Sequence, residues 1–568
     1  MDRKMKQTIV GASVVVAIII ICVVLVIKDK MTPSDEHMEL TEYYQVKQDE
    51  ILVFMENYQY EKTGLYIDNT VYIDYDTVEQ YINKRFYWDN NENLLIYTTP
   101  TDIIKVTAGE KDYVVNKSEE KTDYQVVRVK GDQVYIALEF VKKYSNVEYE
   151  VFLEPNRVVL TCNWGKQFQY AEAGENLSVR VEPDIKSAIL EDVEVGELVV
   201  FVDEGAQENG FVKVMTTSGV IGYAREKYLL DGEYVVLENE YKEPEYTSIK
   251  KKGTINMVWH QVFSKSSNDD LLSMVDGTTG INVISPTWFS IANENGEITS
   301  LASEKYVKQA HKLGMDVWAL VDDFNKEIDK PKLFGRTSSR EKLSNELIAA
   351  AIRYDLDGLN IDFEQIKADY SKSYIQFLRE LSVKCRNNGL ILSIDNYIPA
   401  AYNKFYDREE QGIIADYIIC MAYDEHFSGS EESGSVSSID YVTQSLADTK
   451  KEVPTEKIIM ALPFYTRLWR ETKDGDKVKV SSEAYSMVKA EKLLQNKNVT
   501  LEWNGEIGQY YGQYQEEGAT FKMWLEDEKS YETKLKAVFS EPIAGVAAWK
   551  LGLEKQSIWN IIAKYATK

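Results

Sequence analysis

From Gly253 onward, short apolar runs alternate with amphipathic helical segments, and this alternation limits the possible fold more than any other feature of the chain. The pattern is typical of a parallel β/α fold. Eight strands in about 310 residues fit a (β/α)8 TIM barrel that carries an insertion. A doubly wound open sheet is the alternative, but it requires a glycine-rich phosphate turn after its first strand, and the sequence has none there. The eight runs are 254–263, 281–289, 316–322, 358–364, 390–397, 417–424, 457–465 and 543–550.

The segment between the seventh and eighth runs is too long for a simple connection. Residues 468–540 contain aromatic, strand-like stretches and a glycine-rich tyrosine segment. We predict that they form a small inserted α+β subdomain that walls one side of a cleft at the barrel mouth.

The fourth run has polar side chains at every second position: Asn360, Asp362 and Glu364 share one face of the predicted strand. An ordinary core strand has no use for three polar groups in register, because each would need a buried partner. In a parallel barrel, the inner face near the carboxyl end of a strand opens into the active-site mouth. Two carboxyl groups this close cannot both ionise cheaply, so the pKa of one rises, as a general acid requires.

At these residues the chain resembles glycoside hydrolase family 18, the chitinase-like hydrolases. Their motif Asp-x-x-Asp-x-Asp-x-Glu matches at Asp357, Asp362 and Glu364, and Asn360 replaces its second Asp. In the family, the second Asp takes part in proton exchange with the third. Asn360 cannot ionise, so Asp362 would here be steered by hydrogen bonding alone. The form Asp-Gly-x-Asn-x-Asp-x-Glu is similar to the branch with spore-cortex and cell-wall N-acetylglucosaminidases. The resemblance makes Asp357 and Asn360 candidates for substrate binding.

The sixth run ends in a second segment that resembles the family. Met421 and Tyr423 share one face of the predicted strand, and Asp424 begins the following loop. The family has a Met-x-Tyr-Asp segment at this place, and its Tyr and Asp address the acetamido group of the substrate. We therefore expect Met421 and Asp424 to bind substrate and Tyr423 to take part in catalysis.

Aromatic residues near the ends of other runs complete the candidate site. In the family, a Trp at the place of Trp549 forms the floor under the reacting sugar, and the alternative is a core Trp. Tyr465 and Arg467, at the end of the seventh run, are candidate sugar contacts. Trp288, after the second run, is a weaker candidate of the same kind. His426 is expected to orient a neighbouring acid or loop, because no Ser or Cys nucleophile pattern accompanies it.

The resemblance implies retaining hydrolysis in which the substrate supplies the nucleophile. Glu364 would protonate the leaving oxygen, and the 2-acetamido oxygen of the sugar would attack the anomeric carbon. Asp362 would hold the acetamido N–H, and Tyr423 would donate to the attacking carbonyl oxygen. The implied substrate is an N-acetylated glycan, peptidoglycan first and chitin second, and neither a metal nor an organic cofactor is needed. The alternative is a barrel that binds glycan without cutting it; such proteins typically lose the acid, and Glu364 is present.

The amino terminus contains an apolar run, residues 9–27, interrupted only by Gly11 and Ser13. At ~1.5 Å per residue, such a helix nearly spans a hydrocarbon core of ~30 Å. A cleaved signal peptide is the alternative, but no small-residue cleavage site follows the run. Basic residues precede it, so we expect a single-pass anchor within residues 1–30, a cytoplasmic amino terminus and an extracytoplasmic catalytic domain.

The middle of the chain repeats itself at a constant offset of 63 residues. Each copy reads as a strand, a short helix and a hairpin, and two copies together would bury a shared face. The region, residues 42–165, resembles the copper-amine-oxidase amino-terminal-like stalk repeats. It is interpreted as a spacer, with a wall-binding module as the alternative. The recurring residues are Val71, Tyr72, Ile73, Val78, Tyr81, Asn93 and Thr98 in the first copy and Val134, Tyr135, Ile136, Val141, Tyr144, Asn156 and Thr161 in the second.

Residues 168–232 contain short strands separated by glycine turns at regular spacing, which predicts a small β barrel. The pattern resembles the bacterial Src-homology-3-like domain, which often contacts peptidoglycan peptides; a spacer without a ligand is the equal alternative. Residues 233–252 are charged and are predicted to form a linker before the barrel domain, residues 253–568.

The formal net charge of −27 argues against binding to nucleic acid or to anionic lipid, since both require a basic face. Four widely spaced cysteines form neither a disulfide framework nor a metal-binding spacing. We expect the protein to act as a monomer that contacts a glycan and, through its apolar helix, the cell membrane.

Overall fold

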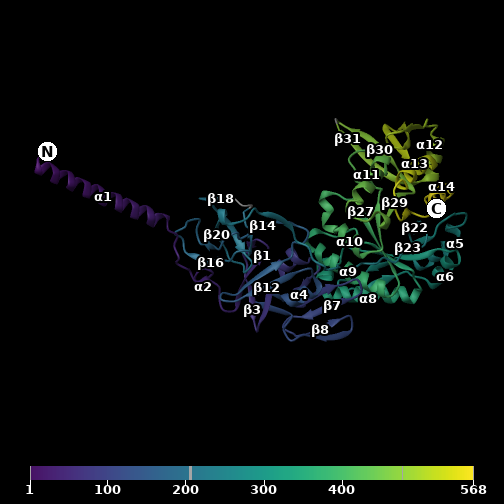
Figure 1. Cartoon of the computed structure of the whole chain (residues 1–568). Helices are drawn as coiled ribbons and strands as arrows, with labels where there is room; N and C mark the ends of the chain where they lie inside the picture. The colour runs from purple at the N-terminus through teal and green to yellow at the C-terminus, as the bar shows by residue number, and fades with distance from the viewer. Residues whose placement is uncertain (1, 204–206, 476, 567–568) are drawn as a thin grey trace. The chain divides into compact units, whose positions relative to one another are not determined.

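The computed structural model describes residues 2–203, 207–475 and 477–566. The chain divides into two compact units (Figure 1). The first comprises Met1–Trp88 and Lys105–Glu243, and the second comprises Asp89–Ile104 and Pro244–Lys568.

The first helix of the chain, α1 (Arg3–Met31), contains the apolar run found in the sequence. Within the described residues, it is the one helix that is long and apolar enough to cross a membrane, over Gln7–Met31. The side chains from Gln7 to Met31 are exposed, so protein packing does not explain their apolar character.

The two repeats of the first unit pair with each other through equivalent strands. In the antiparallel pair of β4 and β11, Ile73 lies opposite Ile136, which is the same position of the second repeat. Such pairing buries the apolar faces that each repeat alone would expose. The elements of residues 40–161, of which β6 and parts of β5 and β7 belong to the second unit, are α2 (Leu40–Tyr43), β1 (Glu50–Met55), β2 (Tyr58–Gln59), β3 (Gly64–Ile67), β4 (Thr70–Asp74), α3 (Tyr75–Thr77), η1 (Val78–Ile82), β5 (Tyr87–Asp89), β6 (Leu94–Thr98), β7 (Ile103–Thr107), β8 (Asp112–Val115), β9 (Ser118–Lys121), β10 (Val127–Lys130), β11 (Gln133–Ala137), α4 (Leu138–Tyr144), β12 (Glu148–Phe152) and β13 (Arg157–Thr161).

The remainder of the first unit is a β domain with the strand order β16-β15-β20-β19-β17-β14-β21. Its last strand, β21 (Glu233–Val236), pairs with β14, so the first four residues of the predicted linker are part of this sheet. The other elements are β14 (Gln167–Glu172), β15 (Leu177–Arg180), β16 (Ile189–Val193), β17 (Leu198–Phe201), β18 (Gln207–Glu208), β19 (Phe211–Thr216), β20 (Ile221–Arg225) and η2 (Glu226–Tyr228).

The second unit contains a closed parallel barrel of eight strands, as the alternation of apolar runs predicts. The first strand, β22, pairs with both β23 and β35, and this pairing closes the sheet. All eight strands fall within the predicted runs except for the end of β23, which continues to Ile291. The strands are β22 (Ile255–His260), β23 (Val283–Ile291), β25 (Asp316–Asp322), β26 (Gly358–Asp362), β27 (Ile391–Tyr397), β28 (Tyr417–Met421), β29 (Ile458–Pro463) and β35 (Gly545–Trp549).

Helices cover the outer face of the barrel (Figure 1). On β26, Leu359 and Ile361 point outward into the apolar layer below these helices, whereas Asn360 and Asp362 point inward. The surrounding elements are η3 (Lys265–Asp270), α5 (Leu271–Met274), β24 (Ile298–Ser300), α6 (Glu304–Lys312), α7 (Lys330–Gly335), α8 (Thr337–Tyr354), η4 (Ala368–Tyr370), α9 (Ser371–Asn387), η5 (Ala401–Tyr406), α10 (Arg408–Ile414), α11 (Ile439–Thr449), η6 (Thr455–Lys457), α13 (Glu528–Val538) and α14 (Ser557–Ala566).

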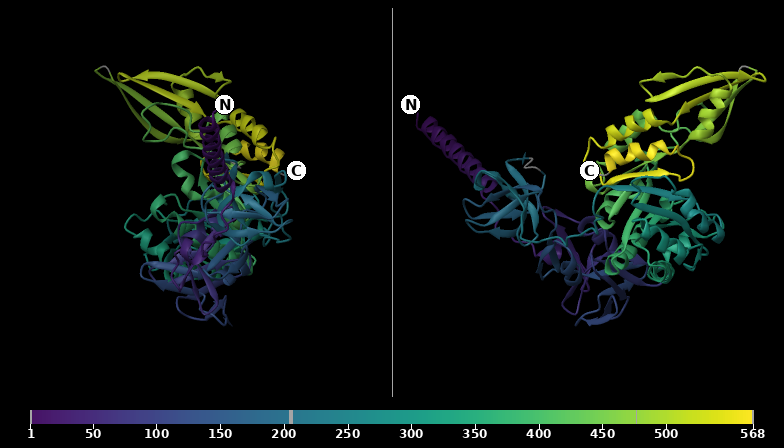
Figure 2. Two further views of the ribbon diagram at one scale, coloured as in Figure 1. Left: turned by 60° about the vertical axis from the view of Figure 1, so that its left-hand side comes forward. Right: turned by 90° about the vertical axis from the view of Figure 1, so that its right-hand side faces the viewer.

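Residues 465–525, between β29 and α13, fold as a five-stranded sheet with the order β31-β30-β34-β33-β32 and one packed helix, α12. Figure 2 shows this sheet projecting from the barrel. The elements are β30 (Tyr465–Asp474), β31 (Lys477–Ser486), α12 (Met487–Asn496), β32 (Glu502–Asn504), β33 (Gln509–Glu516) and β34 (Ala519–Leu525).

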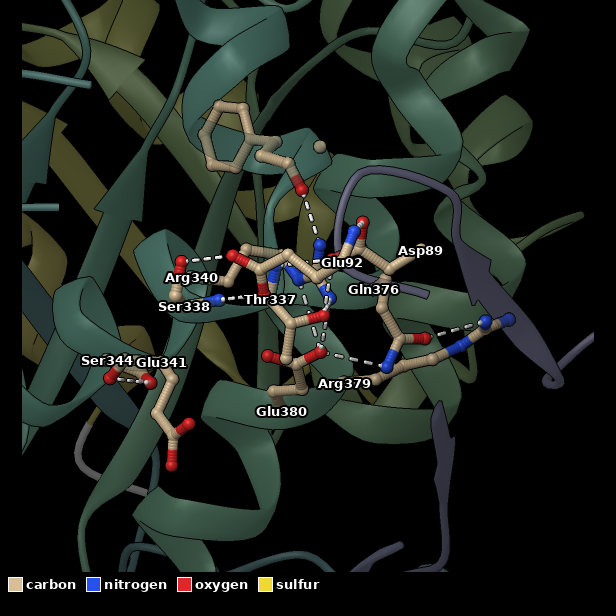
Figure 3. Close-up of polar contacts among 12 residues, drawn as sticks. Asp89, Glu92, Thr337, Ser338, Arg340, Glu341, Ser344, Gln376, Arg379 and Glu380 are labelled. Carbon is tan, nitrogen blue, oxygen red and sulfur yellow. Dashed lines mark hydrogen bonds and ion pairs between the residues drawn. The ribbon is translucent and has the colours of Figure 1, made fainter. Parts of the chain in front are cut away.

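The barrel unit also includes Asp89–Ile104, far from the rest of it in sequence. The buried carboxylate of Asp89 accepts the backbone N–H of Thr337, at 2.6 Å, and the Thr337 hydroxyl, also at 2.6 Å (Figure 3). Arg336, the residue at the N-cap position of α8, makes no side-chain cap bond. Asp89 therefore supplies the cap of α8 from a distant part of the chain.

Candidate active site

A pocket of about 470 Å³ opens at the carboxyl ends of the barrel strands. This is the end at which TIM barrels carry their active sites. The structure brings eight of the eleven sequence-predicted residues to its lining. They are Trp288, Asp362, Glu364, Met421, Tyr423, Asp424, Tyr465 and Trp549.

The acid Glu364 lies just beyond β26, which ends at Asp362. Its carboxylate accepts a hydrogen bond from the Tyr397 hydroxyl. Burial raises the pKa of Glu364, and the Tyr397 hydrogen bond opposes that rise. A carboxyl group with a raised pKa at the mouth of a barrel is suited to donate a proton.

Asp362 is 6% exposed and lies below Glu364. Burial raises its pKa well above the usual value, and the charges of Asp395 and Glu364 raise it further. A hydrogen bond links the Asp362 and Glu364 carboxyl groups. The titrations of Asp362 and Glu364 are therefore coupled, and their apparent pKa values belong to the pair and not to either residue.

Asn360 lies inside the barrel, beneath the pocket, and does not line it. Its amide group makes four hydrogen bonds, so both its oxygen and its nitrogen are fully engaged. The oxygen accepts from the Trp259 indole at 2.9 Å and from the Ser285 hydroxyl at 3.1 Å. The nitrogen donates to Ser393 at 3.1 Å and to Asp395 at 2.7 Å. Asn360 therefore supports the pocket from below and is not placed to contact a sugar.

Asp357 lies at the opposite end of β26 from the pocket. Its carboxylate accepts the backbone N–H of Val317 at 2.7 Å and contacts the His311 ring at 2.9 Å. These contacts fasten β26 to β25 at the closed end of the barrel. Asp357 therefore belongs to the motif but does not reach the pocket, because five residues of extended strand separate it from the mouth of the barrel.

Arg467 also lies outside the pocket lining. Its guanidinium donates to the Ser482 hydroxyl across the β30–β31 pair at 3.0 Å. The positive charge of Arg467 opposes the rise that burial causes in the pKa of the neighbouring Tyr465. The structure therefore places Arg467 near Tyr465 but outside the pocket lining.

Two tyrosines and Asp424 form one wall of the pocket. The Tyr465 hydroxyl donates to Asp424 at 2.5 Å, and Asp424 has a left-handed backbone with φ of 58°. Burial raises the pKa of Tyr423 well above its usual value, so its hydroxyl keeps its proton. Tyr423 can therefore donate a hydrogen bond into the pocket.

Tryptophans form part of the floor and side of the pocket. The Trp549 ring packs against Trp259 with a centroid separation of 5.9 Å and faces the cavity. Trp288 is 1% exposed, and its indole donates to Asn268 at 2.8 Å. Trp549 is therefore more accessible to a ligand than Trp288.

The sequence reasoning missed three polar residues around the acids. Asp395 and Tyr397 lie on β27 and contact Asn360 and Glu364, respectively. Asp323 accepts the backbone N–H of Glu364 at 3.0 Å. The fifth apolar run carries polar residues at alternate positions, as the fourth does, and this signal could have identified Asp395 and Tyr397.

His426 contacts its own loop: its ring nitrogen Nδ1 lies 2.9 Å from the Ser435 carbonyl oxygen.

The end of the predicted linker lies against the barrel, because the Asp416 carboxylate accepts the Ile249 N–H at 2.6 Å.

The closed parallel barrel, its acid-lined mouth and a family match over residues 290–554 together indicate a glycosidase. Residues 290–554 match the sequence model of Glycosyl hydrolases family 18. Upstream, residues 52–160 match the Copper amine oxidase N-terminal domain.

Curated relatives resemble the carboxyl-terminal half of the chain. The uncharacterized glycosylase YvbX of Bacillus subtilis (strain 168) is 27% identical over 299 residues, which cover 50% of this chain and 85% of that protein. The cortical fragment-lytic enzyme of Bacillus anthracis is 24% identical over 283 residues, or 48% of this chain and 64% of that enzyme.

Solved structures share the fold. The C-terminal domain of a putative chitinase from Desulfitobacterium hafniense DCB-2 has a TM-score of 0.51 and 20% identity, over 56% of this chain and all of that one. The Bacillus cereus spore cortex-lytic enzyme SleL has a TM-score of 0.50 and 20% identity, over 59% of this chain and 78% of that one.

Proposed function

We propose that this protein is a membrane-anchored, extracytoplasmic glycosidase that cleaves N-acetylglucosamine-containing glycan, with peptidoglycan as its substrate. The observation that carries the proposal is the buried Glu364 carboxyl, which has a raised pKa and lies beside Asp362 in the pocket. A carboxyl group in this state serves as a general acid near neutral pH.

The proposed mechanism uses the acetamido group of the substrate as nucleophile. Glu364 protonates the leaving oxygen, and the acetamido oxygen attacks the anomeric carbon to form an oxazolinium ion. Asp362 accepts a hydrogen bond from the acetamido N–H and stabilises the positive charge, while Tyr423 donates to the acetamido oxygen. Glu364 then acts as the base for the attacking water.

The rest of the pocket supports binding of a neutral sugar ring. The Trp549 indole faces the cavity, and an aromatic face suits the apolar face of a pyranose. Asp424 is held by the Tyr465 hydroxyl and is exposed at the mouth. We propose that Trp549 forms the floor under the reacting sugar and that Asp424 and Met421 contact its substituents.

The choice of peptidoglycan over chitin rests on location and on relatives. The helix α1 is long enough to hold the protein beside the wall of its own cell. The curated relatives include cortical fragment-lytic enzymes, and the name indicates that these act on cortex fragments. A cleaved signal sequence is the competing reading of α1.

The test is product analysis on purified peptidoglycan and on chitin oligomers with the detergent-solubilised full chain. Mass spectrometry is expected to find fragments with a new reducing-end N-acetylglucosamine, more abundantly from peptidoglycan. Glu364→Gln, which keeps the shape of the side chain but not its proton, is the control and is expected to give no fragments. Glycan that binds the intact protein and is never cut would instead identify a glycan-binding protein.

A further inference from the structure

The neighbouring strands β26 and β27 place a second carboxyl group beside Asp362. In their parallel register Ile361 lies opposite Ile394, so Asp362 and Asp395, the next residues along the two strands, are neighbours. Adjacent strands are about 4.8 Å apart. Both side chains line the pocket and both are at most 6% exposed, so two carboxyl groups share one buried space.

Each of these two carboxyl groups has one buried oxygen without a hydrogen-bond partner among the described residues, Oδ1 of Asp362 and Oδ2 of Asp395. Their remaining contacts are made to other groups. Asp362 is hydrogen-bonded to the Glu364 carboxyl, and Oδ1 of Asp395 accepts the Asn360 amide at 2.7 Å. Unpartnered buried oxygens are costly, and one proton between them would satisfy both.

A positive side chain does not supply the missing partner. None of the described residues that line the pocket is a lysine or an arginine. Lys330 lies nearby but pairs with Asp323 at 2.8 Å. A proton shared between Asp362 and Asp395 would relieve the repulsion between their carboxyl groups.

We propose that Asp395 is a positioning residue that shares a proton with Asp362 and so performs the proton exchange that Asn360 cannot perform. The carboxyl groups form a row, Glu364, Asp362 and Asp395, with a donor at each end: the Tyr397 hydroxyl at Glu364 and the Asn360 amide at Asp395. The proposal rests on the proposed function, because it concerns the role of Asp362 toward the acetamido group.

The shared proton would move from Asp362 to Asp395 and back in each catalytic cycle. As the oxazolinium ion forms, the O–H bond on Asp362 breaks and a new O–H bond forms on Oδ2 of Asp395. Asp362 then faces the cation as a carboxylate, while Glu364 has separately given its own proton to the leaving oxygen. The proton returns to Asp362 when water attacks, so no other reactant is consumed.

Several other titratable groups act on this pair, and each bears on the pH dependence. In the wild-type protein the shared proton leaves one negative charge spread over Asp362 and Asp395, whereas in Asp395→Asn that charge lies on Asp362 alone, beside Glu364. A nearby like charge raises the pKa of an acid, so the alkaline limb of the rate profile, which reports loss of the Glu364 proton, is expected to move to higher pH. The titratable groups that interact electrostatically with the pair are Asp322 at the end of β25, Asp323 just after it, Glu364 after β26, Tyr374 on α9, Tyr397 on β27 and Tyr423 after β28.

Infrared spectroscopy of the protein with carbon-13-labelled aspartate tests the shared proton without substrate. A protonated aspartate band at neutral pH is expected in the wild-type protein and is expected to disappear in Asp395→Asn. Absence of such a band from the wild-type protein would overturn the proposal, and this outcome does not require any variant to fold.

Kinetics on an N-acetylated glycan test the positioning role. Asp395→Asn is expected to lower kcat on the order of 10²-fold, to change KM little and to move the alkaline limb to higher pH. The double variant Asn360→Asp/Asp395→Asn returns one carboxyl group to the row. It is expected to recover the wild-type kcat and the wild-type pH position of the alkaline limb. Ser393→Ala, which removes another partner of Asn360 but no carboxyl group, is the matched control and is expected to change neither.

The outcomes separate the two proposals. Asp395 does not position Asp362 if a folded Asp395→Asn variant keeps the wild-type kcat and the wild-type pH position of the alkaline limb. The same conclusion follows if the double variant remains as slow as the single variant. If the wild-type protein cuts no N-acetylated glycan, the proposed function fails, and the infrared band still decides whether Asp362 and Asp395 share a proton.

Discussion

Replacement of Tyr397 by Phe is the most direct test of the acid in the pocket. The Tyr397 hydroxyl donates a hydrogen bond to Glu364, and such a bond favours the carboxylate form and lowers the pKa. The variant loses that bond, so the carboxyl group becomes harder to ionise. The pKa of Glu364 therefore rises, and the acid keeps its proton to a higher pH.

The size of the change follows from the strength of the bond. A hydrogen bond to a charged group contributes about 1.5–3 kcal/mol. One pKa unit corresponds to about 1.4 kcal/mol, so the bond accounts for about one to two units. Tyr397 is 41% exposed, and water can replace part of the lost bond, so we expect a shift of about one unit.

The assay is kcat/KM against pH on an N-acetylated glycan, with the alkaline limb as the readout. The limb is expected to move up by about one pH unit in Tyr397→Phe. Tyr406→Phe is the control, because the Tyr406 hydroxyl donates to the Phe363 carbonyl oxygen at 3.1 Å and not to a carboxylate. An alkaline limb that stays in place or moves down in Tyr397→Phe would refute the assignment of Glu364 as the acid.

Four further predictions concern the acid, the fold, the membrane and the substrate. Glu364→Gln is expected to lower kcat by ~10² to 10⁴, and near-normal turnover would contradict its role. Asp89→Ala leaves the Thr337 donors unpaired and is expected to destabilise the first turn of α8 by about 2 kcal/mol, seen as faster hydrogen exchange there; Glu92→Ala, whose partner Ser338 is exposed, is expected to have a smaller effect. Full-length protein is expected to stay with membranes through a carbonate wash, whereas a new amino terminus near residue 30 would identify a signal peptide. De-N-acetylated glycan is expected to resist cleavage and a thiazoline analogue of the cyclic intermediate to inhibit; efficient cleavage without inhibition would require a nucleophile on the protein.

The sequence by itself determined the elements and the class of fold. Alternation of apolar and helical segments predicts eight barrel strands, and all eight form in the structure. Apolar residues at every second position predict that Asp362 points into the barrel, and it does. These features follow from local chemistry, because the period of a strand and the length of an apolar helix are properties of a few consecutive residues.

Only the tertiary structure decided which side chains meet. Asp395 lies beside Asp362 because two strands, separated by a helix, pair in one register. Asp357 belongs to the same motif and lies at the other end of the barrel, while Asn360 lies one pleat below the pocket. Asp89 caps a helix that begins 248 residues later. The period of a strand predicts the face of a side chain but not its height or its neighbours, since these depend on the register of strand pairing and on long-range packing.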